Sequence, residues 1–260
     1  GTLGDIYIND AFSCSHRKQA SVHNITKYVK KNYAGPLLKK EITAINLVVK
    51  NKKEPVTCII GGSKISTKIN VITSIMKKVN NLIIVGAMAN NFFVYKNLNI
   101  GKSLFEKDTK DIIKNIYKKA KESGCKIFIP EDCVVGINFE GEGINKNFND
   151  INNDEIILDI GKNTVKNIIK IIDQSNTILW NGPAGYFEND NFLKGTLSIA
   201  ENISKNTIEK SLISVIGGGD TLAAINKNKS KLSFSHLSTA GGAFLEYLEG
   251  KDLPGISVLK

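Results

Sequence analysis

Short runs of apolar residues, rich in Val, Ile and Leu, recur along the chain, with glycine-containing loops or helical stretches between them. Six runs stand out: Val56–Ile60, Leu82–Val85, Lys126–Ile129, Thr177–Trp180, Leu212–Ile216 and Phe234–Leu237. Continuous apolar character over four or five residues is typical of strands that are buried on both faces. The pattern therefore predicts a six-stranded parallel sheet.

The segments between these runs carry helical spacing. Apolar residues three and four positions apart form three sets: Ile69, Ile72, Ile75 and Met76; Ile112, Ile116 and Ala120; Val165, Ile168, Ile169 and Ile172. Strands that alternate with helices indicate βαβ units with right-handed crossovers. We therefore expect an α/β protein with a doubly wound, Rossmann-like domain.

The first 53 residues have a different pattern. Asp5–Ile8 is a candidate strand, and Pro36 opens a helix that we expect to continue to about Lys53, since proline is favoured in the first helical turn. This helix is predicted to connect a small N-terminal part to the α/β domain. An Asn-rich stretch at 145–153 is predicted to be an exposed loop.

Composition narrows the class of protein. The 260 residues are 42% hydrophobic and 23% charged, which fits one large or two small globular domains. We expect no membrane span and no secretory leader, because no run of about 18 apolar residues and no leader pattern is present. The four cysteines lack metal-site spacing and are too few for a disulfide framework, so we expect a cytoplasmic location.

The net charge of +10 is uneven, because residues 1–53 hold ten Lys/Arg against three Asp/Glu. Such a segment could meet an anionic substrate or nucleic acid, or its lysines could simply be solvated. Nucleic-acid binding is disfavoured, because the aromatic residues of this segment do not interleave with its basic residues. We expect neither nucleic-acid nor membrane partners.

Glycine-bearing loops follow five of the six predicted strands. These loops are Gly61–Lys68, Gly86–Asn90, Asn181–Glu188, Gly217–Thr221 and Ser238–Ala243. Ligands of open parallel sheets bind beyond the carboxyl ends of the strands, and glycine lets backbone amides approach a phosphate closely. The five loops together indicate a phosphate-containing ligand at this edge of the sheet.

The common nucleotide motifs are absent. Gly101-Lys102-Ser103 matches the end of a Walker A motif, but Lys96 occupies the position of its first glycine, and no strand is followed by G-x-G-x-x-G. Lys64 and Lys68 stand four residues apart at a predicted helix start, where their repulsion would be relieved by a polyanion. The alternative is that both lysines are solvated.

Three residues of the later loops have candidate roles of their own. Asp220 is either the N-cap of a helix or a hard oxygen ligand for Mg²⁺. Glu188 could accept hydrogen bonds from a ribose, and Pro183 could cover a purine base.

Taken together, five motifs resemble the phosphoglycerate kinase family. They are Asn-Asp-Ala-Phe-x-x-x-His-Arg (9–17), Gly-Gly-Ser-Lys-x-x-x-Lys (61–68), Trp-Asn-Gly-Pro-x-Gly-x-Phe-Glu (180–188), Gly-Gly-Gly-Asp-Thr (217–221) and Ser-Thr-x-Gly-Gly-Ala-x-Leu-Glu (238–246). The resemblance extends to Leu-Glu-Gly-Lys-x-Leu-Pro-Gly (248–255). It implies reversible phosphoryl transfer from 1,3-bisphosphoglycerate to Mg-ADP in glycolysis, giving 3-phosphoglycerate and ATP, by a monomeric enzyme.

The resemblance also implies roles for individual residues. Catalytic roles fall to Lys68, Lys64, Gly241 and Gly242, triose binding to Arg17, and Mg²⁺ binding to Asp220. The implied nucleotide-binding residues are Gly61, Gly62, Ser63, Lys64, Lys68, Gly86, Leu158, Asn181, Pro183, Glu188, Gly217, Gly218, Gly219, Asp220 and Thr221. Ala240 stands where the family often has glycine, which would restrict that loop if it needs a positive φ.

The resemblance divides the chain into a remnant of a triose-binding domain (1–36), an interdomain helix (37–53), a nucleotide-binding domain (54–244) and a returning tail (245–260). Of the family's triose-binding half, only His16 and Arg17 have counterparts here. We therefore expect either a phosphoglycerate kinase represented mainly by its nucleotide domain, or a Mg-nucleotide-binding module without catalysis of its own.

Overall fold

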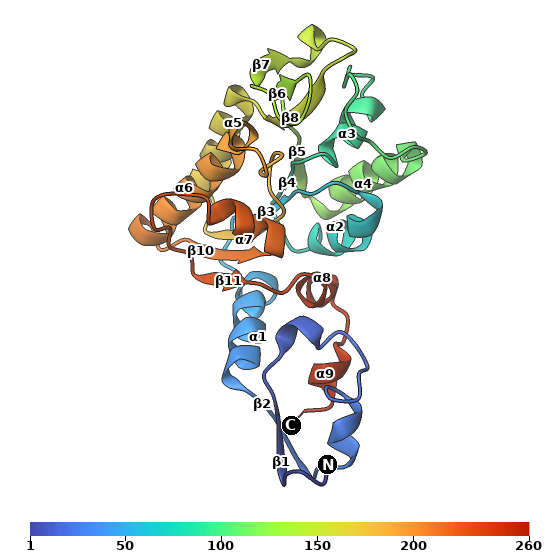
Figure 1. Ribbon diagram of the computed structural model, residues 1–260, viewed down its shortest axis with the longest axis vertical. Coiled ribbons are helices and arrows are strands. Elements are labelled where there is room, and N and C mark those ends of the chain that lie inside the picture. The colour runs from blue at the N-terminus through green and yellow to red at the C-terminus, as the bar shows by residue number, and fades with distance from the viewer. Residues whose placement is uncertain (260) are drawn as a thin grey trace.

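The computed structural model describes residues 1–259. It consists of a large upper part and a small lower part, which holds both termini, and helix α1 runs between them (Figure 1). None of the helices within residues 1–259 is long and apolar enough to cross a membrane.

A six-stranded, fully parallel sheet forms the centre of the large part. In spatial order its strands are β5 (Lys126–Phe128), β4 (Asn81–Ile84), β3 (Val56–Ile60), β9 (Thr177–Asn181), β10 (Ile213–Gly217) and β11 (His236–Ser238). The chain thus builds the sheet outwards in one direction from β3 and then in the other from β9. This is the strand order of a doubly wound nucleotide-binding fold, and its switch point lies between β3 and β9. The predicted α/β sheet and all six of its strands are confirmed, with shifts of one or two residues at their ends.

The two faces of this sheet bury different side chains of the same strands. Cys58, Ile60 and Leu82 face one hydrophobic core, whereas Ile59 and Trp180 face the other. Because successive side chains of a strand point to opposite faces, unbroken apolar runs are what a sheet covered on both sides requires. The first core is covered by helices α1 (Pro36–Val49), α2 (Ile69–Ile75), α3 (Ala89–Tyr95), α4 (Lys110–Ser123) and α8 (Gly242–Glu249), and the second by α5 (Lys162–Asp173), α6 (Lys194–Glu209) and α7 (Gly219–Ile225).

Local sequence explains where several helices begin and end. Pro36 is the first residue of α1, and the Asp10 carboxylate accepts a hydrogen bond from the backbone N–H of Leu38 at 2.8 Å. The helix ends at Val49, four residues before the predicted end. Helix α4 buries Ile113, Ile116 and Ala120 and ends at Ser123, and the following Gly124 takes the left-handed conformation common after a helix.

The sequence did not predict a second, antiparallel sheet at the top of the large part (Figure 1). Its strands are β7 (Ile144–Asn147), β6 (Asp132–Gly136) and β8 (Ile156–Ile160), in that spatial order. The loop predicted at 145–153 is therefore partly wrong: its first residues lie in β7 and the next in a 3₁₀ turn, Phe148–Asp150. Strand β7 has one apolar residue followed by three polar ones, so the sequence shows no alternation of apolar and polar residues there. Phe148, which follows β7, is buried.

The lower part is built from the two ends of the chain. Strands β1 (Ile6–Asn9) and β2 (Lys31–Ala34) form a two-stranded parallel sheet, which confirms the strand predicted near Asp5–Ile8. The short helix α9 (Pro254–Ser257) lies beside it (Figure 1). The Asn9 side chain ties the two ends together by donating to the Gly255 carbonyl at 2.9 Å. The remaining 3₁₀ turns are Phe12–Cys14, Asn24–Lys27, Ser66–Lys68 and Asp190–Phe192.

Candidate functional site at the switch point of the sheet

The loops that follow β3 and β9 meet at the switch point. The backbone N–H of Gly61 donates to the Asn181 carbonyl at 2.8 Å, continuing the strand pairing into the loops. Gly182 has φ of 100°, and a Cβ built there would lie 2.4 Å from the carbonyl carbon of Gly61. Only glycine allows this approach, so two of the predicted phosphate loops pack directly backbone against backbone.

A cavity of about 550 Å³ opens beside these loops. Its size suits a nucleotide-sized ligand. Seven of the residues anticipated from sequence line it: Gly62, Ser63, Gly86, Leu158, Pro183, Glu188 and Asp220. These residues come from five separate segments, and the fold brings them to one place.

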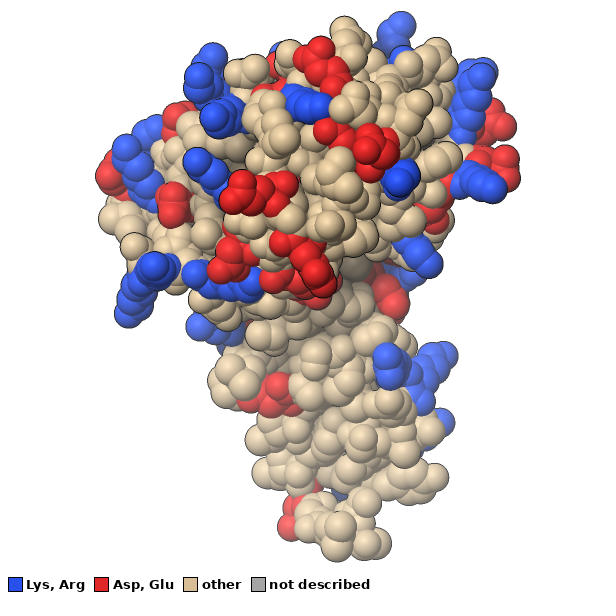
Figure 2. Space-filling model, turned by 45° about the horizontal axis from the view of Figure 1, so that its top comes forward, with Lys and Arg blue, Asp and Glu red and all other residues tan. Residues whose placement is uncertain are grey.

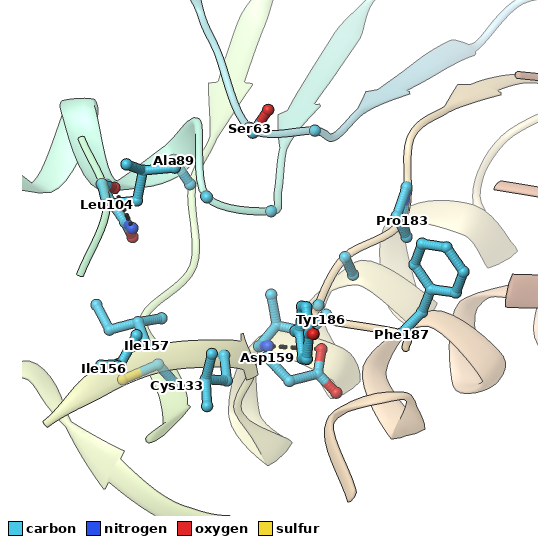
Figure 3. A pocket seen from close by; sticks show the side chains of 18 of the residues that line it. Ser63, Ala89, Leu104, Cys133, Ile156, Ile157, Asp159, Pro183, Tyr186 and Phe187 are labelled. Atoms are coloured by element: carbon cyan, nitrogen blue, oxygen red, sulfur yellow. Dashed lines mark hydrogen bonds between the residues drawn. The ribbon is translucent and has the colours of Figure 1, made fainter. Parts of the chain in front are cut away.

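Much of the cavity wall was not anticipated. Ile156 and Ile157 of β8 and Cys133 of β6 form one side, and Leu104 lies across from them (Figure 3). Tyr186 and Pro183 lie on a third side. The apolar run at 156–160 was a usable signal for a strand, but nothing in the sequence indicated that an antiparallel sheet would fold over the carboxyl edge of the parallel one.

The side chain of Lys68 lies under the loop that follows β3. Its ammonium donates to the Gly61 carbonyl at 2.6 Å and to the Asn181 Oδ1 at 2.8 Å. Burial lowers the pKa of Lys68 to about 8, although the neighbouring Cys58 and Asp220 oppose this shift. A lysine with this pKa, beside glycine loops, is a functional candidate.

Lys64 differs from Lys68 in its surroundings. The prediction that both lie on one face of a helix is wrong, because α2 begins at Ile69 and Lys64 precedes the 3₁₀ turn Ser66–Lys68. Lys64 is exposed, whereas Lys68 is partly buried. The two lysines therefore do not form a matched pair, and only Lys68 is fixed by contacts beneath the loop.

Asn181 and Thr221 fasten the loops to one another. The Asn181 Nδ2 donates to the Gly217 carbonyl at 2.8 Å while its Oδ1 accepts from Lys68. The Thr221 hydroxyl accepts from the Gly182 N–H at 2.7 Å and donates to the Gly217 carbonyl at 2.9 Å. Both side chains are buried, so they support the cavity wall from behind.

The Gly217–Thr221 loop turns sharply into α7. Gly218 has φ of 100° and precedes the first residue of the helix, Gly219. The reading of Asp220 as an N-cap is therefore wrong, because Asp220 is the second helical residue. Its exposed carboxylate lines the cavity, as a metal-binding or phosphate-facing group would.

The described residues form no cluster of three or more His, Cys, Asp or Glu side chains that could hold a metal by themselves. A single carboxylate at a phosphate site fits Mg²⁺, which commonly takes one or two protein carboxylates and completes its shell with phosphate oxygens and water. The donor set at Asp220 is thus compatible with a metal that arrives with a nucleotide.

Gly241, Gly242 and Arg17 come together outside this cavity. Gly242 begins α8, and a Cβ built on it would lie 3.1 Å from the Nε2 of His16. The Arg17 Nε lies 3.4 Å from the same His16 nitrogen. Ala240 is not among the residues with positive φ, so the alanine at this position does not strain the loop.

Two titratable groups of the cavity wall escaped the sequence analysis. Burial raises the pKa of Asp159 to about 7, even though the N–H groups of Gly195 and Ile160 hydrogen-bond its carboxylate and oppose the shift. Burial also raises the pKa of Cys133 to about 12, so this thiol stays protonated and unreactive at neutral pH.

The fold and cavity define a doubly wound α/β protein with a ligand site at its switch point. The family model for phosphoglycerate kinase matches residues 1–251, and the chain belongs to this family. It is 44% identical to a phosphoglycerate kinase of Wolbachia pipientis wMel over 100% of this chain, and 46% identical to one of Francisella philomiragia.

Solved structures agree with this assignment. The structure of phosphoglycerate kinase from Coxiella burnetii matches with a TM-score of 0.91 at 40% identity over 98% of this chain. The enzyme of Pyrococcus horikoshii matches with a TM-score of 0.84 at 28% identity over 99% of this chain. The present chain spans about 65% of the length of these relatives.

Proposed function

We propose that residues 54–244 bind Mg-ADP or Mg-ATP in the cavity at the switch point. We also propose that the whole protein is a phosphoglycerate kinase, which transfers a phosphoryl group reversibly from 1,3-bisphosphoglycerate to Mg-ADP. The observation that carries the proposal is that seven anticipated nucleotide-binding residues, from five segments, line one cavity. Similarity to named phosphoglycerate kinases over the whole chain favours this function over a nucleotide-binding module without catalysis.

Different regions of the cavity suit the base, the phosphates and the ribose of a nucleotide. Its apolar side, with Leu158, Pro183 and Tyr186, suits a purine base. The glycine loops at Gly62 and Gly86 suit the phosphates, because their backbone can approach an anion closely. Glu188 is exposed at the cavity edge, where its carboxylate can accept hydrogen bonds from ribose hydroxyls.

Asp220 would hold Mg²⁺, which supplies charge neutralisation of the transferred phosphate when bound. Lys68 would contribute positive charge from beneath the loop after β3, and Lys64 from the solvent side. Gly241 and Gly242, at the start of α8, would present backbone N–H groups to the transferred phosphoryl group. Arg17 beside them would contact the triose substrate. The phosphoryl donor and the phosphoryl acceptor would then meet between the large and the small part of the molecule.

The division of the chain follows the same proposal. Residues 54–244 would form the nucleotide-binding domain, residues 1–36 and the tail 245–260 would belong to the triose-binding side, and residues 37–53 would join the two.

The Asp220→Ala variant tests the nucleotide site. We expect wild-type chain to bind Mg-ADP at a single site in titration calorimetry, and the variant to bind at least tenfold more weakly because a metal ligand is lost. The free energy of unfolding should change by no more than about 1 kcal/mol, since Asp220 supplies only a charge near a helix N-terminus.

Asp111→Ala is a matched control, because Asp111 is the second residue of α4 as Asp220 is of α7, and both are exposed. It should leave the affinity for Mg-ADP unchanged. No heat from the folded wild-type chain at millimolar Mg-ADP, or equal affinities of the Asp220 variant and the wild type, would contradict the proposal.

A further inference from the structure

One segment connects the apolar wall of the cavity to the loop after β3. It runs from Gly101 to Glu106, and both Lys102 and Leu104 line the cavity. The backbone N–H of Lys102 donates to the Glu155 carbonyl at 2.7 Å, which fixes one end of the segment to the residue that precedes β8. The Leu104 carbonyl accepts a hydrogen bond from the Asn90 Nδ2 at 2.8 Å, which fixes its middle to α3.

The other end of the segment is fixed at Glu106. Its backbone N–H donates to the Asn91 Oδ1 at 2.9 Å, and Asn91 is a buried residue of α3. The Asn91 Nδ2 in turn donates to the Met88 carbonyl at 3.1 Å. The Glu106 carboxylate is thereby held at a set place beside the loop that carries Lys64 and Lys68.

The Glu106 carboxylate binds that loop through two hydrogen bonds from Ser66. Its Oε2 accepts from the Ser66 N–H at 3.0 Å, and its Oε1 accepts from the Ser66 hydroxyl at 2.5 Å. Partial burial would raise the pKa of Glu106, but hydrogen bonds from Ser66 and Ile65 and the charge of Lys64 outweigh it and lower the pKa. The group is therefore ionised at neutral pH, when it accepts these bonds most strongly.

Ser66 lies between the two lysines of the loop. It is the first residue of the 3₁₀ turn that ends at Lys68, and Lys64 lies two residues before it. Holding the backbone and hydroxyl of Ser66 therefore restrains the short stretch of backbone from which both lysines extend. The Ser66 N–H is also already occupied by the carboxylate, so that a phosphate in the cavity would depend on the lysines and glycine loops instead.

We propose that Glu106 is a positioning residue of the nucleotide site, whose carboxylate holds the loop after β3 so that Lys64 and Lys68 meet the phosphates. Through the segment that contains Lys102 and Leu104, it also links the wall facing the base to the loop facing the phosphates. This inference rests on the proposed nucleotide site, and it assigns a role to a residue that lies outside the glycine loops themselves.

The test compares ligands with and without phosphates. In titration calorimetry on the full 260-residue chain, Glu106→Ala should weaken binding of Mg-ADP about tenfold. Binding of adenosine, which has the base and ribose but no phosphate, should change less than twofold. Glu106→Gln, whose amide oxygen can still accept one bond from Ser66, should have an intermediate effect on Mg-ADP. Glu122→Ala removes an exposed carboxylate of α4 that pairs with Lys118 at 3.9 Å, and it should leave both affinities unchanged.

A double-mutant cycle separates positioning from general destabilisation. If Glu106 acts through the lysines, its removal in a Lys68→Met background should weaken Mg-ADP binding by much less than tenfold. Equal losses for Mg-ADP and adenosine, or an undiminished effect in the Lys68→Met background, would overturn the role of Glu106. Normal binding of Mg-ADP by both Glu106 variants would overturn it as well. Absence of Mg-ADP binding by the wild-type chain would instead overturn the proposed site, and the inference with it.

Discussion

The two parts of the molecule make opposite use of parallel strands. In the large part, β3 and β9 lie in the middle of a six-stranded sheet, paired on both edges and packed on both faces. Within residues 1–259, strands β1 and β2 of the small part pair only with each other, and Ile6, Ile8 and Tyr33 remain exposed. Parallel strands are usually buried on both faces. The strands of the large part meet this rule, and those of the small part do not.

The surfaces of the two parts differ as well. Basic and acidic side chains are both spread over the large part in the view of Figure 2. The small part shows mostly uncharged residues on that face. The excess of basic residues in 1–53 therefore does not form one continuous basic patch on this side. In this chain, seven residues proposed to bind the nucleotide line one cavity, whereas Arg17 is the one residue proposed to bind the triose.

The largest expected effect concerns turnover. A coupled assay with 1,3-bisphosphoglycerate and Mg-ADP should give a rate for this chain at least about 10³-fold below that of a full-length member of the family. Phosphoryl transfer depends on positioning and charge stabilisation, and well-oriented binding can supply about 7–11 kcal/mol of the barrier reduction. We expect Arg17, the one residue of this chain assigned to the triose, to be insufficient to hold it in line.

The assay needs a sample that is shown to be folded and to bind Mg-ADP. A rate within about tenfold of the full-length enzyme would show that the small part already contains a sufficient triose site, and the comparison between the two parts would fail.

The next effect compares two isoleucines of parallel strands. Ile59 of β3 is fully buried, whereas Ile8 of β1 is 58% exposed. Truncation of Ile59 to alanine should lower the free energy of unfolding by about 2–5 kcal/mol, because it leaves a cavity in a close-packed core. The same change at Ile8 should cost less than about 1 kcal/mol.

Denaturant unfolding, followed by the far-ultraviolet circular dichroism signal, measures both values. Similar losses at the two positions would mean that the exposed face of β1 is covered in solution, for instance by a second copy of the chain, which sedimentation would detect.

The smallest effect is a proton taken up by Lys68. With a pKa of about 8, Lys68 is about half neutral at pH 8 in the free chain. A bound polyanion favours the charged form, so Mg-ADP binding should take up about half a proton at pH 8 and almost none at pH 6. Titration in two buffers of different ionisation enthalpy measures this number.

Lys68→Arg is the control, because arginine remains charged and should abolish the uptake at pH 8. The same shift makes Lys68 oppose folding below pH 8. Since the folded pKa lies below the unfolded value of about 10.5, this opposition disappears as the pH rises from about 8 to 10.5. An uptake that is equal in wild type and Lys68→Arg would assign the proton to another group.

Much of the candidate site could be predicted because it depends on short-range sequence. Glycines after apolar runs mark the phosphate loops, and parallel strands bring their carboxyl ends to one edge, so Gly62, Gly86, Pro183 and Asp220 meet as expected. The roles of buried groups could not be predicted this way. Asn181 and Thr221 are predicted to bind the nucleotide, and the structure adds that their polar atoms join one loop to another.

The sequence by itself determined the alternation of strands and helices, the six strands of the parallel sheet and the family, because each is encoded in local periodicity or in contiguous motifs. Only the tertiary structure decided how the cavity is closed and how its charges are set. The antiparallel sheet that brings Cys133 and Ile156 to the wall, the burial that lowers the pKa of Lys68, and the contact of Glu106 with Ser66 all join residues far apart in the chain. Such contacts depend on packing and desolvation in three dimensions, and a one-dimensional pattern carries no record of them.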